Sequence, residues 1–204
     1  MASSYASDSM NPGRAALANR AGVSTASPED GPIGLKVREV AHLGKLNIRC
    51  GNFAAKAIKA NTGCAFPPDN NKVTSAGARH VVWLGPDEYL LLCEAGLESE
   101  LKRKITAELA GQHFAITDVT DSLCALQLEG PKVRAVLAKG CALDLHPRQF
   151  TPGDCAQTFL SHAGVTLVAM DENCFLVICR TSFAPYMVDW LQDAAMEYGF
   201  SLKN

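Results

Sequence analysis

Three side chains that could support chemistry lie close together in the sequence. Cys141 carries a thiol that could act as a nucleophile or a metal ligand. Asp144 and His146 are two residues apart, so in an extended segment both project to the same side as a possible acid–base pair. The structural alternatives are a packed thiol behind a helix C-cap at Gly140 and a turn in which Asp144 accepts a backbone N–H, with Pro147 holding His146 extended. We expect the structural roles.

Asp118 and Asp121, on either side of Thr120, are the other candidate catalytic carboxylates. The pattern Asp-x-x-Asp-Ser between two predicted strands also describes a turn in which an aspartate accepts a backbone hydrogen bond. No neighbour in the sequence identifies itself as a group that would tune the pKa of either carboxyl. We therefore predict no catalytic residue in this chain.

Metal and cofactor motifs are missing from the sequence. Cys174 and Cys179 are five residues apart, and the other possible ligands are scattered without a close Cys-x2–4-Cys pair: Cys141, His146, Cys155 and His162. Neither Gly-x-Gly-x-x-Gly nor Gly-x4-Gly-Lys-Ser/Thr occurs, so the dinucleotide-binding fingerprint and the phosphate-binding loop are both lacking. We predict no metal-binding and no cofactor-binding residue.

The composition is that of an ordinary globular protein, with 48% hydrophobic and 20% charged residues, a net charge of −2 and a pI of about 6.2. Without a basic stripe, nucleic acid and anionic membranes are poor partners. Several of the 8 cysteines lie in apolar runs, such as Cys93 and Cys179, and residues 1–11 do not have the pattern of a secretory signal. We expect reduced thiols and a cytoplasmic location.

The elements that must position these residues alternate between strands and helices from Leu35 onward. We predict strands or hairpins over 46–50, 80–93, 126–128, 157–161, 165–170 and 174–179, and helices over 53–60, from Leu97, over 132–139 and after a cap at Ser182. The order strand–helix–strand–strand–helix occurs twice, in pseudo-repeats at about 40–115 and 116–204. The sequence therefore predicts an α+β domain over 35–204, with helices packed on antiparallel-rich sheets.

Residues 1–34 differ from the rest because they are rich in Ser, Ala, Asn, Pro and Gly. Such a segment buries too little apolar surface to offset its ordering entropy. We predict an extended N-terminal arm that a partner chain holds, with a helical turn near residues 14–18.

A family becomes visible in the second half. Residues 118–122 and 126–131 resemble a strand pair and helix start of the folate-binding, aminomethyltransferase-like fold. The run Val136-Leu137-Ala138-Lys139-Gly140-Cys141-Ala142-Leu143-Asp144-Leu145-His146-Pro147, with Phe150, Pro152-Gly153 and Cys155-Ala156-Gln157-Thr158, resembles the sarcosine oxidase γ-subunit family. Residues 83–90 and 180–191 are similar to the same family, and the resemblance extends over about 35–200.

The resemblance implies a function that this chain supports without a catalytic centre. The family's holoenzyme is a heterotetramer (αβγδ) that oxidises sarcosine to glycine, an oxidoreductase acting on CH–NH donors with oxygen. Its products are formaldehyde or 5,10-methylenetetrahydrofolate, together with hydrogen peroxide. The resemblance places FAD, FMN, NAD, tetrahydrofolate and zinc in the other subunits, and it gives the α, β and δ chains as partners.

Two alternatives stay open. The Lys-Gly-Cys run also marks folate-binding proteins linked to iron–sulfur maintenance, although an aromatic residue and Gly-Gln-Glu follow it there, and Ala142 to Leu145 follow it here. A stand-alone folate-binding, aminomethyltransferase-like protein could use Cys141 or Asp118. A γ-like subunit of a related dehydrogenase could serve another N-methyl amino acid, such as N-methylglutamate.

Overall fold

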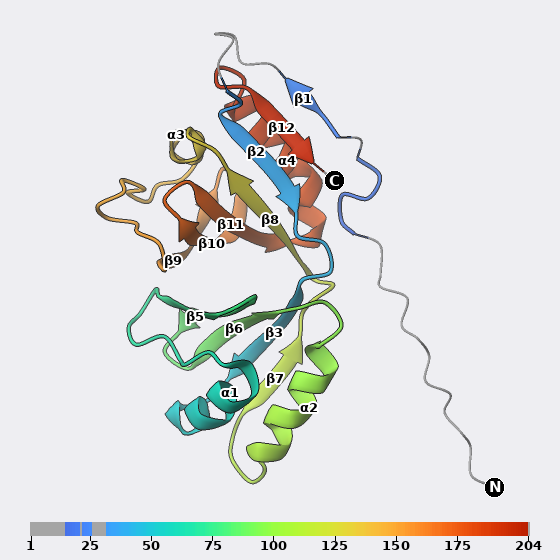
Figure 1. Cartoon of the computed structure of the whole chain (residues 1–204), viewed down its shortest axis with the longest axis vertical. Helices are drawn as coiled ribbons and strands as arrows, with labels where there is room; N and C mark the ends of the chain where they lie inside the picture. The colour runs from blue at the N-terminus through green and yellow to red at the C-terminus, as the bar shows by residue number, and fades with distance from the viewer. Residues whose placement is uncertain (1–14, 21, 26–31, 204) are drawn as a thin grey trace, which may run out of the picture.

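Two β-sheets lie face to face, and each carries helices on its outer side, so the chain forms a helix–sheet–sheet–helix stack (Figure 1). The computed structural model describes residues 15–20, 22–25 and 32–203. Three buried clusters correspond to the three interfaces of the stack. One lies between each sheet and its helices, and the third joins the two sheets.

The first half of the chain builds a five-stranded sheet in the order β4-β5-β6-β3-β7. Every neighbouring pair in it is antiparallel. Its elements are β3 (Gly44–Arg49), η1 (Asn52–Ala54), α1 (Ala55–Thr62), β4 (Val73–Ala76), β5 (Arg79–Gly85), β6 (Glu88–Cys93), α2 (Glu98–Glu108) and β7 (Ala115–Asp118).

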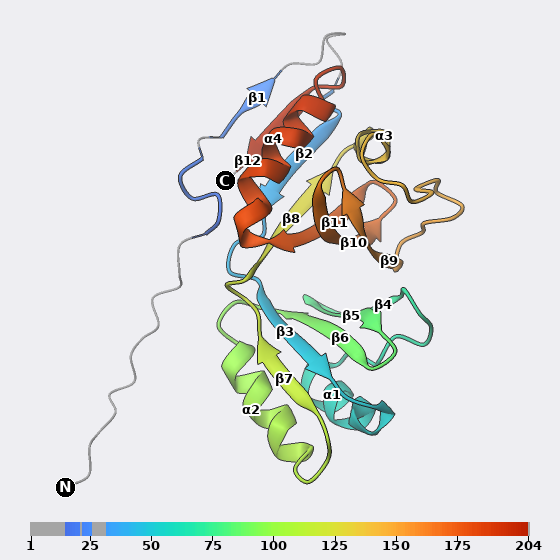
Figure 2. The same cartoon turned by 180° about the vertical axis from the view of Figure 1, so that it is seen from behind.

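The second half builds most of a seven-stranded sheet in the order β1-β12-β2-β8-β11-β10-β9. Its elements are β1 (Ser24–Thr25), β2 (Leu35–Glu39), β8 (Leu123–Glu129), α3 (Val133–Ala138), β9 (Cys155–Leu160), β10 (Ala163–Asp171), β11 (Cys174–Arg180), η2 (Thr181–Phe183), α4 (Ala184–Ala194) and β12 (Phe200–Lys203). Figure 2 shows α4 lying along the outer side of this sheet.

The predicted α+β class and repeated halves are confirmed, and each half contains more strands than predicted. The order β3-α1-β4-β5-β6-α2-β7 recurs as β8-α3-β9-β10-β11-α4-β12. Strand β2 breaks the symmetry, because it comes before the first repeat yet lies in the sheet of the second. It pairs antiparallel with β8 and parallel with β12.

The apolar runs in the sequence follow from sheets that are covered on both faces. In β6, Leu91 and Cys93 face the helices of their own sheet, whereas Leu90 and Leu92 face the other sheet. Because both faces are buried, the strand is a continuous apolar run with no polar alternation.

Gly140 has a different role from the predicted helix cap. Helix α3 ends at Ala138 with Lys139 as its C-cap, and Gly140 does not have the left-handed backbone of a capping glycine. A Cβ placed on Gly140 would lie 2.4 Å from Cζ2 of Trp190. The glycine therefore allows the indole ring of α4 to approach the backbone.

The predicted cap at Ser182 is wrong. Helix α4 begins at Ala184, and no side chain caps it. Ser182 lies instead in the short helix η2, and Pro185 occupies the first turn of α4, where a missing N–H costs nothing.

Part of the N-terminal arm packs on the chain's own core. The carboxylate of Glu39 accepts the backbone N–H groups of Ala16 and Leu17, each at 2.8 Å. Leu17 is only 4% exposed, and β1 pairs with β12. Residues 1–14, 21 and 26–31 of the predicted arm lie outside the described residues, so its contact with a partner chain stays a prediction.

Candidate functional site

The candidate acid–base pair forms a turn, as the structural alternative predicted. Oδ1 of Asp144 accepts the backbone N–H of His146 at 2.9 Å. Nδ1 of His146 accepts the backbone N–H of Arg148 at 3.2 Å, so the imidazole lone pair on that atom is occupied. Both Asp144 and His146 are exposed, and each interacts with backbone and not with the other's side chain.

The second pair of candidate carboxylates, Asp118 and Asp121, lie in different surroundings. Oδ1 of Asp118 accepts the backbone N–H of Thr120 at 2.9 Å, which is the predicted turn. Asp121 lines a small cavity of about 220 Å³ that also contains Glu39, His42 and Cys124. Among the described residues, neither carboxylate is hydrogen-bonded to Cys141 or His146.

Cys141 is a packed thiol. It is 9% exposed, belongs to the core under α4, and pairs through an isolated bridge with Leu160. Its Sγ lies 3.9 Å from Oγ1 of Thr158, a contact long enough to be weak. The arrangement offers no adjacent base that would generate a thiolate.

Burial raises the pKa of several other thiols, whereas the contact with Cys124 lowers the pKa of Cys179. Burial raises the pKa of Cys50 to about 11 and those of Cys93 and Cys155 to about 12. A cysteine pair that the sequence did not indicate, Cys124 and Cys179, lies directly opposed on β8 and β11. The Cys179 thiol beside it, its own burial and the Glu39 carboxylate all raise the pKa of Cys124.

Cys174 and Cys179 cannot chelate one ion through a shared face. They lie five positions apart on one strand, so their side chains project from opposite faces of the sheet. In the part of the chain that the structure describes, no group of three or more His, Cys, Asp or Glu side chains could hold a metal.

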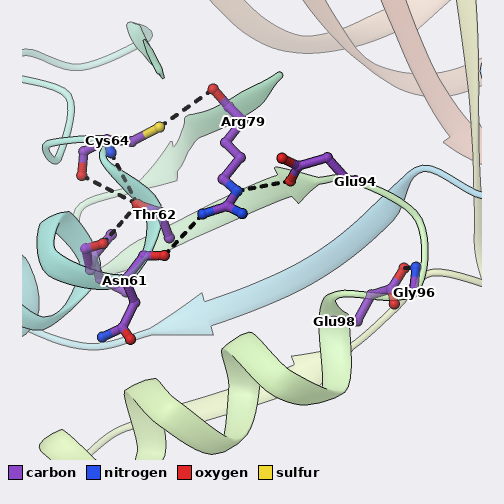
Figure 3. Close-up of polar contacts among 8 residues, drawn as sticks. Asn61, Thr62, Cys64, Arg79, Glu94, Gly96 and Glu98 are labelled. Atoms are coloured by element: carbon purple, nitrogen blue, oxygen red, sulfur yellow. Dashed lines mark hydrogen bonds and ion pairs between the residues drawn. The ribbon is translucent and has the colours of Figure 1, made fainter. Parts of the chain in front are cut away.

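Figure 3 shows a polar network that fastens α1 to the hairpin of β5 and β6. Nε of Arg79 donates to Oε2 of Glu94 at 2.8 Å, and NH1 donates to the carbonyl of Asn61 at the end of α1 at 3.1 Å. Oγ1 of Thr62 accepts the N–H of Cys64 at 3.1 Å, and the Cys64 thiol donates to the carbonyl of Arg79 at 3.4 Å. All of these donors and acceptors belong to local turns or to the contact between α1 and the hairpin, which is typical of a structural tie.

Lys45 is a buried cation that sequence reasoning missed. Its side chain is 3% exposed, and Nζ donates to the carbonyls of Leu43 at 2.6 Å and Thr120 at 3.2 Å. Burial lowers the pKa of Lys45, and nearby acidic groups oppose that shift. The lysine ties β3 to the turn that begins the second half.

A groove with a volume of about 940 Å³ lies between the two sheets. At one end the sheets pack through Leu90, Leu92 and Ile178, and at the other end they diverge. We call this opening the inter-sheet groove. Its lining residues are Asn47, Leu84, Glu88, Leu90, Val119, Ser122, Leu123, Gln157, Thr158, Phe159, Gly164, Val165, Thr166, Ile178, Cys179, Arg180, Thr181 and Ser182.

Of the described side chains that line the inter-sheet groove, only those of Glu88 and Arg180 are charged, and their situations differ. Glu88 accepts hydrogen bonds from Asn47 at 2.8 Å and Arg49 at 2.6 Å, which lower the pKa of its carboxyl against the effect of burial. Arg180 is exposed, and its guanidinium makes no hydrogen bond or ion pair with any described residue. The groove therefore has one uncompensated positive charge.

A single aromatic side chain dominates the apolar surface of the inter-sheet groove. Phe159, on the edge strand β9, is 68% exposed. Opposite it in the β9–β10 register is Gly164, and a Cβ at Gly164 would meet no atom within 4 Å. Gln157 spans the groove nearby, because its Nε2 donates to the carbonyl of Leu84 in the other sheet at 2.7 Å.

None of the helices in the described part of the chain has the length and apolar character needed to cross a bilayer.

Comparison with known proteins shows which family has this sequence and architecture. The model of the family described as "Sarcosine oxidase, gamma subunit family" matches residues 49–197. A sarcosine oxidase subunit gamma from Corynebacterium sp. (strain U-96) is 32% identical over 201 residues, covering 97% of each chain. One from an Arthrobacter species is 33% identical over 165 residues, covering 79% of this chain and 80% of that one.

Solved structures agree. A chain of the heterotetrameric sarcosine oxidase from Corynebacterium sp. U-96, in complex with pyrrole 2-carboxylate, has a TM-score of 0.76 at 33% identity and covers 82% of this chain and 87% of that chain. The aminomethyltransferase T of the glycine cleavage system from Bartonella henselae has a TM-score of 0.59 at 12% identity, covering 83% of this chain and 47% of that chain. At 12% identity the second likeness shows the fold alone. This is the aminomethyltransferase-like fold that residues 118–122 and 126–131 resemble in sequence. The chain belongs to the sarcosine oxidase gamma subunit family.

Proposed function

We propose that this chain is the non-catalytic γ subunit of a heterotetrameric (αβγδ) sarcosine oxidase. The observation that carries the proposal is the near full-length match to a gamma subunit, together with the likeness to a chain of the heterotetrameric enzyme. Matches confined to one segment would support only a shared module. Here 97% of each chain is covered, which supports the same role in the same kind of assembly.

The surroundings of the candidate residues support a role without chemistry. Asp118, Asp144 and His146 each accept a local backbone N–H, and Cys141 is packed in the core. A general base must reach the proton that it removes, and a reactive thiol must lie in a partly exposed, electropositive place. We therefore assign no catalytic, cofactor-binding or metal-binding residue to this chain.

In the proposed assembly, the other subunits perform the oxidation of sarcosine to glycine with release of hydrogen peroxide. They hold FAD, FMN, NAD and zinc, and tetrahydrofolate accepts the methyl carbon as 5,10-methylenetetrahydrofolate, which otherwise leaves as formaldehyde. The γ chain buttresses the α subunit, whose folate-binding region it resembles. Eight free thiols in a fold that places Cys124 opposite Cys179 favour a reducing, cytoplasmic location.

A second candidate function is a stand-alone folate-binding protein. The likeness to aminomethyltransferase T favours it only at the level of fold, and fold does not determine function. An assembly that oxidises a different N-methyl amino acid is a variant of the first proposal, because no feature of this chain reads the substrate.

Native mass spectrometry of the chain purified from its own cells, with a flavin absorbance scan, tests the proposal. We expect a heteromeric complex with two large flavin-bearing chains, and turnover of sarcosine that Cys141→Ala leaves unchanged. A colourless monomer would refute the subunit role. If such a monomer bound tetrahydrofolate in calorimetry, the stand-alone alternative would replace it.

A further inference from the structure

The inter-sheet groove has an exposed aromatic side chain that the fold does not use. Phe159 lies on the groove-facing side of β9, and at 68% it is the most exposed of the four large apolar side chains that reach the surface among the described residues. Large aromatic side chains at protein interfaces carry a disproportionate share of the binding free energy when a partner covers them. In the isolated chain this ring contributes little to folding, which suggests a role in assembly.

The position next to Phe159 is empty. Gly164 is paired with Phe159 on β10, it has no side chain, and a Cβ there would meet nothing within 4 Å. The backbone of Gly164 is not in the left-handed region, so the glycine is not required by conformation. The result is a notch beside the aromatic ring that an apolar side chain from outside can fill.

The charged side chains of the groove determine the sign of the charge that a partner should carry. Glu88 forms an ion pair with Arg49 and accepts a hydrogen bond from Asn47, whereas Arg180 is exposed and unpaired among the described residues. A guanidinium binds carboxylates in a bidentate geometry that also fixes orientation. The complementary group is therefore a carboxylate.

The edge strand beside the groove has no charged side chain that would repel an apolar segment. Strand β9, Cys155 to Leu160, contains no charged residue and no proline, the devices that usually protect an edge strand. It is also the longest of the four edge strands in the described sheets, with six residues against four in β4 and β7 and two in β1.

From these features we infer that the inter-sheet groove is the docking site for a segment of another subunit of the oxidase. That segment places an apolar side chain in the notch between Phe159 and Gly164 and a carboxylate against Arg180. The inference rests on the proposed subunit role and specifies the surface and the chemistry through which this chain joins the assembly. Burial of the Phe159 ring supplies affinity, and the Arg180 ion pair supplies orientation.

The first test compares matched variants in the complete complex. Phe159→Ser is expected to raise the dissociation constant of the γ chain by at least about tenfold, measured by native mass spectrometry over a dilution series. Arg180→Gln is expected to raise it by roughly three- to tenfold, with a smaller effect at high salt because a partly exposed ion pair is screened. Met196→Ser and Arg103→Gln alter an equally exposed apolar residue, at 67%, and an exposed arginine on α2, both outside the groove lining. These two controls should leave the dissociation constant unchanged.

A second test does not depend on how well the variants fold. A photo-crosslinking benzoylphenylalanine at position 159 in the purified complex should attach to a peptide of the α, β or δ chain that contains an apolar residue and a nearby Asp or Glu. The same amino acid at Met196 should not attach to that peptide. A cross-link to a second copy of this chain, a bound small molecule in the groove or no cross-link at all would overturn the inference. So would variants of Phe159 and Arg180 that dissociate like the wild type. Those results would leave the subunit role standing if the wild-type complex is intact, whereas the absence of a wild-type complex would refute the subunit role itself.

Discussion

Replacing Gly140 by alanine should destabilise the chain, although the backbone conformation of Gly140 alone predicts the opposite. Gly140 has no left-handed backbone, so alanine could adopt its conformation and would reduce the entropy of the unfolded chain, a gain of about 0.4–1 kcal/mol. The packing reverses this sign. The new Cβ would lie 2.4 Å from Cζ2 and 2.9 Å from Cη2 of Trp190, and 3.1 Å from the backbone nitrogen of Ser161.

Neither neighbour can move away easily. The backbone N–H of Ser161 donates to the carbonyl of Gly140 at 2.8 Å, and Trp190 packs against the core under α4. Overpacking of this kind costs about 1–3 kcal/mol. In a chain of this size each kcal/mol lowers Tm by roughly 2–4 °C, so a cost of about 2 kcal/mol lowers Tm by roughly 4–8 °C.

Differential scanning calorimetry with two comparisons tests the Gly140 prediction. Gly164→Ala meets no atom within 4 Å and should leave Tm unchanged or slightly raised. In a Trp190→Ala background the cost of Gly140→Ala should fall to within about 0.5 kcal/mol of zero, because the two sites couple through one contact. An unchanged Tm for Gly140→Ala in the wild-type background would refute the close approach of Trp190 as a source of destabilisation. If the loss of stability is as large in the Trp190→Ala background, its cause is the backbone contact with Ser161 and not the indole ring.

Three further outcomes follow from contacts described above. Burial opposes ionisation of Asp154, but hydrogen bonds from Lys72 and from the backbone N–H and hydroxyl of Thr151 outweigh it and lower the pKa of its carboxyl. The ionised carboxylate therefore stabilises the fold above about pH 4, and this stabilisation is lost as the pH falls through the lowered pKa. Between pH 6 and pH 3 the urea midpoint of wild type should therefore fall further than that of Asp154→Asn, and equal slopes would contradict this. Arg134→Lys should lower the unfolding free energy by about 2 kcal/mol in urea titrations, because the guanidinium donates to three carbonyls and a lysine cannot reproduce that fork; a midpoint within error of wild type would exclude it. Leu17→Ala should lower the free energy of unfolding by about 2 kcal/mol in the same urea titrations, because Leu17 is buried. Deletion of residues 1–34 should also weaken subunit assembly without changing the flavin spectrum, and an unchanged complex would refute the role of the arm.

The elements that the sequence predicted well are those whose burial repeats over a few residues. The apolar run Tyr89 to Cys93 indicated β6 because both faces of that strand are covered. The alternation Leu35-Lys36-Val37-Arg38-Glu39 also describes a half-buried strand, β2, although the predicted strands began only at residue 46. Its place between β8 and β12 could not be predicted, because local pattern carries no information on partners so far away in the chain.

The groove was missed for the same reason. It is assembled from β9, β10 and β11 on one side and from the other sheet on the opposite side, so no single segment contains it. One signal was present in the sequence. Phe159 comes two positions after the polar Gln157 and so lies on the same face of the strand, which places an aromatic residue on a face that the sequence marks as partly polar. By contrast, the turns at Asp118 and Asp144 were predictable because they involve only residues two positions apart.

The pairing of β2 with β12 has a consequence for how the chain folds during its synthesis. Strands β3 to β7 are contiguous in the sequence and can form their sheet as soon as residue 118 has left the ribosome. Strand β2 emerges before all of them, yet its two neighbours are β8 and β12, and the latter ends at Lys203. Strand β2 can therefore pair with β8 once residue 129 has left the ribosome, but its other edge stays unpaired until residues 200–203 have been translated. Termination before residue 200 would leave β2 without its parallel neighbour, and such a chain would expose a strand edge that invites aggregation.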